Sequence, residues 1–154
     1  LVSEEWTPDA EMVRKLAYSY SVIALAAKLA SVDGEMNATE INHFMQLFRL
    51  PAHDRGEIPK LMRDAAKDNI DFQHYAARIN TFYPRDVLRR ERLVDRFLKL
   101  GLADGPLTLD EIVFIRRVHS IFGLSQENFY IRVRDLILPK PGLNPYQILG
   151  VKKN

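Results

Sequence analysis

A short acidic pattern occurs twice in the chain, and its side chains are the ones that could ligate a cation. In each copy an Asp-Gly pair follows one apolar segment, and a glutamate precedes the next apolar segment. The shared residues are Asp33, Gly34, Glu40 and Ile41 in the first copy, and Asp104, Gly105, Glu111 and Ile112 in the second. Carboxylate oxygens are the ligands that calcium and magnesium prefer.

The closest chemical comparison is the calcium loop of an EF-hand, in which a glycine makes a sharp turn and a later glutamate binds through both oxygens. Alignment on the glycine places the first and third ligand positions at Leu29 and Ser31 in one copy, and at Leu100 and Leu102 in the other. Leucine offers no oxygen. The sequence therefore excludes a high-affinity EF-hand.

The same residues have a structural interpretation, which the sequence favours. Asn37 to Glu40 and Thr108 to Glu111 each spell a capping box, in which the glutamate returns to the backbone amide of the N-cap residue. The two glycines would allow a positive φ in a tight turn between helices. A cation site or an acidic docking patch stays open as the alternative. Its residues would be Asp33, Glu35, Glu40, Asp104, Asp110 and Glu111.

Catalytic chemistry is not indicated. The chain has no cysteine, which removes thiol nucleophiles, thiolate metal sites and disulfides. We expect His43 and His74 to be surface residues without partners, and His119 to be a hydrogen-bonded core residue. No glycine-rich phosphate loop, nucleophile elbow or histidine-rich metal motif is present. The prediction is a protein that is not an enzyme and holds no cofactor.

Arginines crowd the segment that follows Pro84. Asp86, Glu91 and Asp95 are interleaved with them, which favours a solvated, salt-bridged helix. The alternative is a basic surface that meets anionic lipid head groups or an acidic partner. Its residues would be Arg85, Arg89, Arg92 and Arg96. The net charge is only +2 and no recognition motif accompanies it, so nucleic acid is not an expected partner.

Helices must position these residues, because apolar residues recur at helical spacing almost throughout and strict alternation is hard to find. The fold class expected is all-α, a bundle of about seven helices. Thr7-Pro8 predicts the start of the first helix, with Thr7 as N-cap and proline at the first helical position. The expected segments are 7–32, 38–48, a short one ending at 66, 72–82, 87–102, 108–123 and 125–138.

The longest apolar run, Leu16 to Val32, is interrupted by Lys28 and diluted by serines. A membrane span needs about 20 mainly apolar residues, so this run predicts a buried core helix. Because the acidic repeat lies between helices in both copies, we expect two helical hairpins related by pseudo-twofold symmetry.

The repeat resembles the signature of the TerB-like (tellurite-resistance) family, whose all-helical domains carry Ala-x-x-Asp-Gly and a later glutamate in each half. Ala30 matches the alanine in the first copy, whereas Gly101 replaces it in the second. The resemblance covers roughly residues 16–138. It implies that the first domain, residues 1–138, is a TerB-like helical domain.

The end of the chain resembles the opening of a J domain, the module through which co-chaperones stimulate DnaK-type chaperones. Tyr146, Leu149 and Gly150 fit the aromatic-x-x-Leu-Gly-Val core of its first helix. The working part of a J domain is a His-Pro-Asp loop, and none of the four histidines is followed by Pro-Asp. We therefore expect a linker at 139–144 and a truncated start of a J domain at 145–154.

This order of parts is similar to the layout of DjlA-type, membrane-anchored co-chaperones of Gram-negative bacteria. The resemblance implies a non-catalytic domain that positions the J domain or recruits partners for a DnaK-type chaperone. DnaK would engage the missing remainder of the J domain. Other expected partners are an unknown client, a second copy of the chain and an anionic membrane surface. The expected location is the cytoplasm, on the inner face of the inner membrane. The alternative function is cation or small-ligand sensing by the acidic loops.

Overall fold

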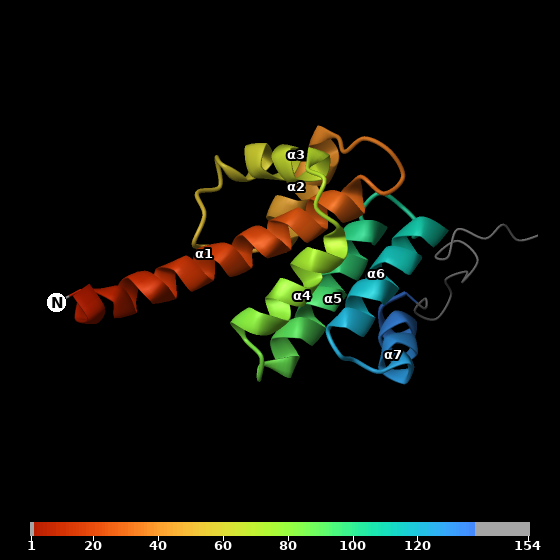
Figure 1. Ribbon diagram of the computed structural model, residues 1–154. Coiled ribbons are helices and arrows are strands. Elements are labelled where there is room, and N and C mark those ends of the chain that lie inside the picture. Colours follow the sequence, from red (N-terminus) through yellow and green to blue (C-terminus); the bar gives the residue numbers. More distant parts are fainter. Residues whose placement is uncertain (1, 138–154) are drawn as a thin grey trace, which may run out of the picture.

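Residues 2–137 are described by a computed structural model, and within that range the chain forms seven α-helices and no strand (Figure 1). This confirms the all-α prediction. The linker and the J-domain opening lie outside the described residues. The helices are α1 Val2–Ala30, α2 Ala38–Leu47, α3 Ile58–Lys67, α4 Phe72–Phe82, α5 Val87–Leu102, α6 Leu109–Ile121 and α7 Gln126–Ile137.

The longest helix, α1, runs through the molecule, and its N-terminal half projects beyond the other helices (Figure 1). The predicted start at Thr7-Pro8 is wrong, because α1 begins at Val2 and continues through the proline. Proline has no amide hydrogen, so a helix that contains it lacks one hydrogen bond to the carbonyl four residues earlier. Only the first turns of α1 precede Pro8, so this loss falls near the start of the helix. The C-terminal half of α1 is buried from Val22 to Ala27.

Two helical hairpins, α1–α2 and α5–α6, contain the acidic repeats at their turns. Gly34 has φ 148° and Gly105 has φ 138°, a region that favours glycine. The turns share one hydrogen-bond pattern: Gly34 N donates to Ser31 O and Gly105 N donates to Leu102 O, each at 3.1 Å. Helix α2 packs on α5, and α6 packs on α1. Reciprocal packing of this kind is what a pseudo-twofold relation between the hairpins requires.

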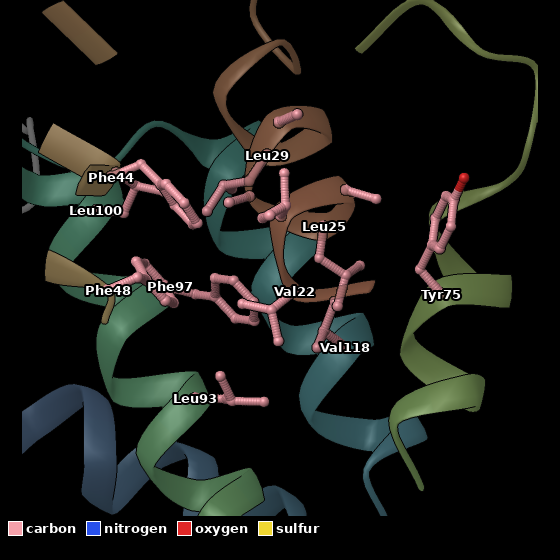
Figure 2. Close-up of a cluster of buried hydrophobic side chains, with 14 of the residues drawn as sticks. Val22, Leu25, Leu29, Phe44, Phe48, Tyr75, Leu93, Phe97, Leu100 and Val118 are labelled. Carbon is pink, nitrogen blue, oxygen red and sulfur yellow. The ribbon is translucent and has the colours of Figure 1, made fainter. Parts of the chain in front are cut away.

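The core lies where the two hairpins face one another (Figure 2). Phe44 stacks on Phe48 with ring centroids 4.5 Å apart, and Phe48 meets Phe97 of α5 at 5.6 Å. Val22 and Leu25 of α1 point into the same cluster. Burial of large side chains from α1, α2 and α5 supplies the main driving force for this arrangement.

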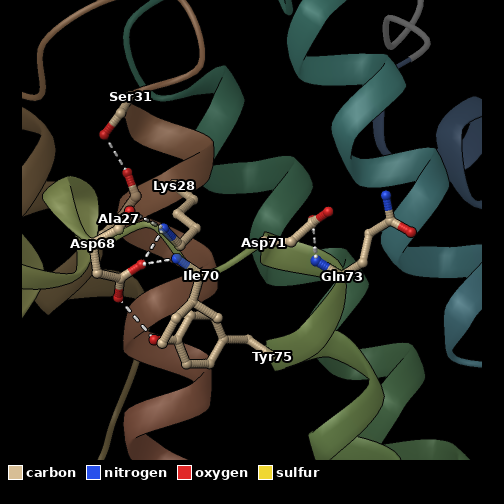
Figure 3. Close-up of polar contacts among 8 residues, drawn as sticks. All are labelled: Ala27, Lys28, Ser31, Asp68, Ile70, Asp71, Gln73 and Tyr75. Carbon is tan, nitrogen blue, oxygen red and sulfur yellow. Dashed lines mark hydrogen bonds and ion pairs between the residues drawn. The ribbon is translucent and has the colours of Figure 1, made fainter.

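Helices α3 and α4 are tied to α1 by a polar cluster at their junction (Figure 3). Lys28 Nζ lies 2.7 Å from Asp68 Oδ1, and the Tyr75 hydroxyl donates to Asp68 Oδ2 at 2.8 Å. The Ile70 amide donates to Asp68 Oδ1 at 3.0 Å. Lys28, which interrupts the apolar run of α1, therefore has a counterion from another part of the chain.

Within residues 2–137, no helix combines the length and the apolarity that crossing a membrane requires.

Candidate functional site

The fold brings the two acidic turns together and connects them crosswise. Thr108, the N-cap of α6, donates through Oγ1 to Asp33 Oδ2 in the first turn at 3.0 Å. In the second turn, Asp104 Oδ1 lies 3.3 Å from His43 Nδ1 on α2, without the alignment of a hydrogen bond. Each turn thus contacts the second helix of the other hairpin. The prediction that His43 has no partner is wrong, because its partner is distant in sequence.

Both predicted capping boxes form. The Asn37 amide donates to Glu40 Oε1 at 2.9 Å, and the Glu40 amide donates to Asn37 Oδ1 at 2.9 Å. The Thr108 and Glu111 pair repeats this exchange at 2.9 and 3.1 Å. Each glutamate of the repeat therefore fastens the first turn of a helix.

The carboxylates of the two turns also repel one another. Burial raises the pKa of Glu40, the Asn37 amide opposes this shift, and the charges of Asp104 and Asp33 add to it. Burial likewise raises the pKa of Glu111, to which the charge of Asp33 contributes. A bound cation would relieve this repulsion, as would an approaching basic group.

The arrangement nevertheless provides no evident metal ligand set. Within the described residues, no three carboxylate or histidine side chains converge as ligands for one ion. Glu40 and Glu111 already accept hydrogen bonds from cap amides, and Asp33 accepts one from Thr108. Glu35 and Asp110 are exposed and take no part in the network formed by these bonds. The structure thus brings together Asp33, Glu40, Asp104 and Glu111, and leaves the other two candidates outside.

The second turn departs from the first at one position with a clear steric cause. Gly101 stands where the first copy has Ala30, and a Cβ at Gly101 would clash with the Leu107 side chain. Leu107 is buried, whereas Met36 at the matching place of the first turn is only half-buried. The glycine therefore makes room for a more deeply inserted leucine.

A second candidate site is a groove between α1, the segment after α2, and α5. It consists of two adjoining cavities of about 240 and 340 Å³, which share Tyr18, Arg49, Leu50 and Arg89. We call it the arginine groove. Its basic half is lined by Arg49, Arg89, Arg92 and Arg96, and its apolar half by Met12, Leu50, Pro51, Ala52 and Tyr83.

The acidic residues of α5 do not neutralise this groove. Glu91 and Asp95 face α7, where Arg132 Nη1 lies 2.8 Å from Asp95 Oδ1 and Arg132 Nη2 lies 3.5 Å from Glu91 Oε2. α5 is thus a solvated, salt-bridged helix, as the sequence favoured, but Glu91 and Asp95 pair with an arginine of α7 and not with the arginines of α5. Within the described residues, Arg92 and Arg96 are exposed and have no ion pair.

One arginine of the groove is held in place by aromatic rings and a carboxylate. The Arg89 guanidinium lies 3.9 Å from the centre of the Tyr83 ring and 5.0 Å from that of Tyr18. Its Nε lies 3.2 Å from Asp86 Oδ2, and Asp86, the N-cap of α5, accepts a hydrogen bond from the Arg89 amide through Oδ1 at 3.0 Å. The hydrogen bond from the Arg89 amide, together with its guanidinium, lowers the pKa of Asp86. Burial raises the pKa of Tyr18, although the Arg89 charge opposes this shift.

The other arginines of this segment divide between the surface and the interior. Arg85 lines a shallow hollow beside Tyr83 and Arg14, next to the groove. Arg90 is buried, and its guanidinium donates to the carbonyls of Phe122, Tyr83 and Pro84 at 3.1 to 3.3 Å. Arg90 is thus a structural residue that joins α5 to the ends of α4 and α6.

Sequence reasoning missed several lining residues of the groove. Lys15, Tyr18, Arg49 and Tyr83 are scattered along the chain, and no local pattern marks them as neighbours. The three arginines of α5 did carry a signal, because positions 89, 92 and 96 lie on one face of a helix.

His119 agrees with its prediction: it is buried, its Nε2 lies 2.9 Å from Asn128 Oδ1, and burial lowers its pKa.

These features define an all-helical protein built from two Asp-Gly hairpins whose turns meet. A family profile described as tellurite resistance protein TerB matches residues 19–134. The chain belongs to the TerB family, whose helical domain is not known to be catalytic. No curated protein and no solved structure gives a significant match to the chain.

Proposed function

We propose that this chain contains the interaction domain of a DnaJ-like co-chaperone. The observation that carries the proposal is the order of parts: a TerB domain over residues 19–134, followed by Tyr146–Val151, which resembles the opening of a J domain. The TerB domain would position the J domain or recruit a partner for a DnaK-type chaperone. In the full-length protein it would lie on the cytoplasmic face of the inner membrane, as in the DjlA-type layout.

The chemistry of the two candidate sites supports a non-catalytic role. Carboxylates in the turns are engaged in capping and in joining the hairpins. The arginine groove offers positive charge and apolar surface, which suit recognition of another molecule. We propose that these surfaces bind, and that DnaK performs the work on the client.

DnaK ATPase measurements test this function. Residues 1–154 contain no His-Pro-Asp, so they should leave the ATPase rate of DnaK unchanged. The chain extended through a complete J domain should raise that rate, and replacement of the histidine in the restored loop by glutamine should abolish the increase. An extended chain that contains His-Pro-Asp and is folded, yet does not stimulate DnaK, would overturn the proposal.

A second function, cation sensing, is favoured by one observation. Burial raises the pKa of Glu40 and of Glu111, and the charges of neighbouring carboxylates in the two turns add to both shifts. Three of these carboxylates already accept hydrogen bonds from the cap amides or from Thr108, and within the described residues no three carboxylate or histidine side chains converge on one ion. The interaction domain therefore remains the better supported function.

A further inference from the structure

The arginine groove has a large excess of positive charge. Its walls carry five cationic side chains, those of Lys15, Arg49, Arg89, Arg92 and Arg96, against the single carboxylate of Asp86. That carboxylate is already paired with Arg89. The remaining cations repel one another across the groove, and this repulsion is relieved when an anionic group enters.

The groove also has an apolar half, which continues the basic half without a break because Tyr18, Leu50 and Arg89 line both. Met12 is half exposed there, and Tyr83 presents its ring beside Arg89. An occupant that fills both halves must carry negative charge at one end and apolar groups at the other. A free phosphate or a single carboxylate would fill only the basic half.

We propose that the arginine groove binds an acidic peptide segment of a partner protein, with carboxylates on Arg49, Arg92 and Arg96 and an apolar side chain against Tyr83 and Leu50. This deepens the proposed function and rests on it, because it gives the chemistry of the partner that an interaction domain would recruit. Arginine matches a carboxylate with two parallel hydrogen bonds, which gives geometric selectivity as well as charge.

The shape of the groove favours a peptide over a membrane surface. Arg49 comes from the segment after α2, whereas Arg92 and Arg96 come from α5, so the cations belong to two walls of one cavity, which the buried Phe48 and Leu93 also line. An extended chain can place side chains between such walls. A bilayer surface presents its head groups in a plane and would meet only the rims.

Arg89 has a different role from the other arginines. Its guanidinium is held between Asp86 and the Tyr83 ring, so its orientation is set before any ligand arrives. A group whose side chain is already ordered loses less entropy on binding. Arg92 and Arg96, which are exposed and without ion pairs among the described residues, would supply the new contacts.

The chain's own C-terminal segment is an unsuitable occupant. Residues 138–154 contain Lys140, Lys152 and Lys153 and no aspartate or glutamate. Their charge has the same sign as that of the groove. Residues 138–154 therefore do not supply the acidic segment.

The test is a selection of short peptides from a randomised library on residues 1–154, followed by fluorescence anisotropy. The proposal expects selected peptides that combine aspartate or glutamate with aromatic or aliphatic residues. Copies with every carboxylate replaced by its amide should bind at least about tenfold more weakly. Enrichment of peptides without acidic residues, enrichment of none, or equal binding by the amide copies would overturn the proposal.

Matched variants separate the groove from general charge. Arg92→Gln with Arg96→Gln should weaken binding of the selected peptides at least about tenfold, whereas Arg116→Gln with Arg117→Gln on α6 removes the same charge and should leave it nearly unchanged. Arg92→Lys with Arg96→Lys should give an intermediate loss of peptide affinity, because lysine keeps the positive charge but cannot form the two parallel hydrogen bonds that a guanidinium makes with a carboxylate. Equal losses in the two glutamine variants would contradict the assignment.

Binding to vesicles of phosphatidylglycerol tests the alternative that the groove meets an anionic membrane surface. The proposal expects the groove variant to bind vesicles as the α6 variant does. A groove variant that loses vesicle binding while it retains peptide binding would assign the surface to the membrane instead.

Neither binding assay involves DnaK. If no acidic peptide binds but the extended chain stimulates DnaK normally, only the proposal for the arginine groove is refuted. Peptide binding by an extended chain that does not stimulate DnaK would refute only the co-chaperone role.

Discussion

Asp68 shows how one carboxylate can hold three parts of the chain. Burial opposes its ionisation, but Lys28, Tyr75 and the Ile70 amide together lower the pKa of Asp68 below its ordinary value. Burial and the neighbouring Asp68 acceptor raise the pKa of Tyr75. Both shifts favour the pairing seen in Figure 3, with Asp68 ionised and Tyr75 protonated. The junction of α3 and α4 should therefore depend on this one charge.

We predict that Asp68→Asn lowers the free energy of unfolding by about 2 kcal/mol at neutral pH, because Lys28 is left part-buried without its counterion. Urea denaturation followed by circular dichroism measures this difference. Asp64→Asn is the control: its carboxylate pairs with Lys60 on the surface and should matter by less than about 0.5 kcal/mol. Equal effects of the two changes would contradict the prediction.

The same residue predicts a pH dependence of stability. The folded-state pKa of Asp68 is depressed, so its contribution is fully present above the unfolded value near 3.8 and is lost as pH falls through the lower folded value. The difference in stability between the wild type and Asp68→Asn should shrink toward zero in that acid range. A difference that stays constant from neutral pH into the acid range would show that the charge is not its source.

The acidic turns give a second prediction at this scale. If the carboxylates only cap helices and join the hairpins, millimolar calcium or magnesium should leave the melting temperature nearly unchanged. A ligand at about 100 times its dissociation constant would stabilise the fold by roughly 2.7 kcal/mol. A saturable rise in melting temperature, lost in Asp33→Asn with Asp104→Asn, would establish cation sensing instead.

At the scale of elements, α5 has three faces with different roles. Leu93, Val94, Phe97 and Leu98 enter the core, Glu91 and Asp95 pair with Arg132 of α7, and Arg89, Arg92 and Arg96 line the groove. Charges that are mixed along the sequence are thus sorted onto different faces of the helix. In the sequence the two acidic residues are interleaved with the arginines, whereas the helical phase places them on a different face from the groove.

Arg90 gives a prediction for the junction of elements. Arg90→Gln shortens the side chain and leaves the Phe122, Tyr83 and Pro84 carbonyls without their donor, which should cost about 2 kcal/mol of unfolding free energy. Arg92→Gln is the same chemical change on an exposed side chain of the same helix and should cost less than about 0.5 kcal/mol. Urea denaturation of the two variants measures these costs: if the m-values are equal, the difference between the midpoints reports the difference in stability. Similar midpoints for the two variants would show that the buried bonds add little.

The element scale also shows what the sequence could predict. The caps at Asn37, Asp71 and Thr108 were predictable because each is made within a few residues of the chain. The link between Thr108 and Asp33 was not, because the two residues are far apart in sequence. The continuation of α1 past Pro8 also escaped prediction, since a local start signal there is overridden by the helix as a whole.

At the scale of the whole molecule, the repeated hairpin explains most of the architecture. Two turns with the same glycine conformation and the same capping box place their carboxylates together and leave α1 at the centre. The arginine groove lies elsewhere, where α1, the segment after α2 and α5 meet. The spacing of Arg89, Arg92 and Arg96 indicates a basic helix face, but the lining residues from the other elements could be recognised only after the helices were placed. The account thus assigns stability to the turns and recognition to the groove.

A division between recognition and chaperone activation is the central claim, and one comparison tests it directly. In the chain extended through a complete J domain, the stimulation of DnaK ATPase should be the same for the wild type and for Arg92→Gln with Arg96→Gln, although the variant binds acidic peptides at least about tenfold more weakly. Parallel measurement of residues 1–154 should show no stimulation. Stimulation by residues 1–154 alone, or loss of basal stimulation in the folded groove variant, would contradict the account.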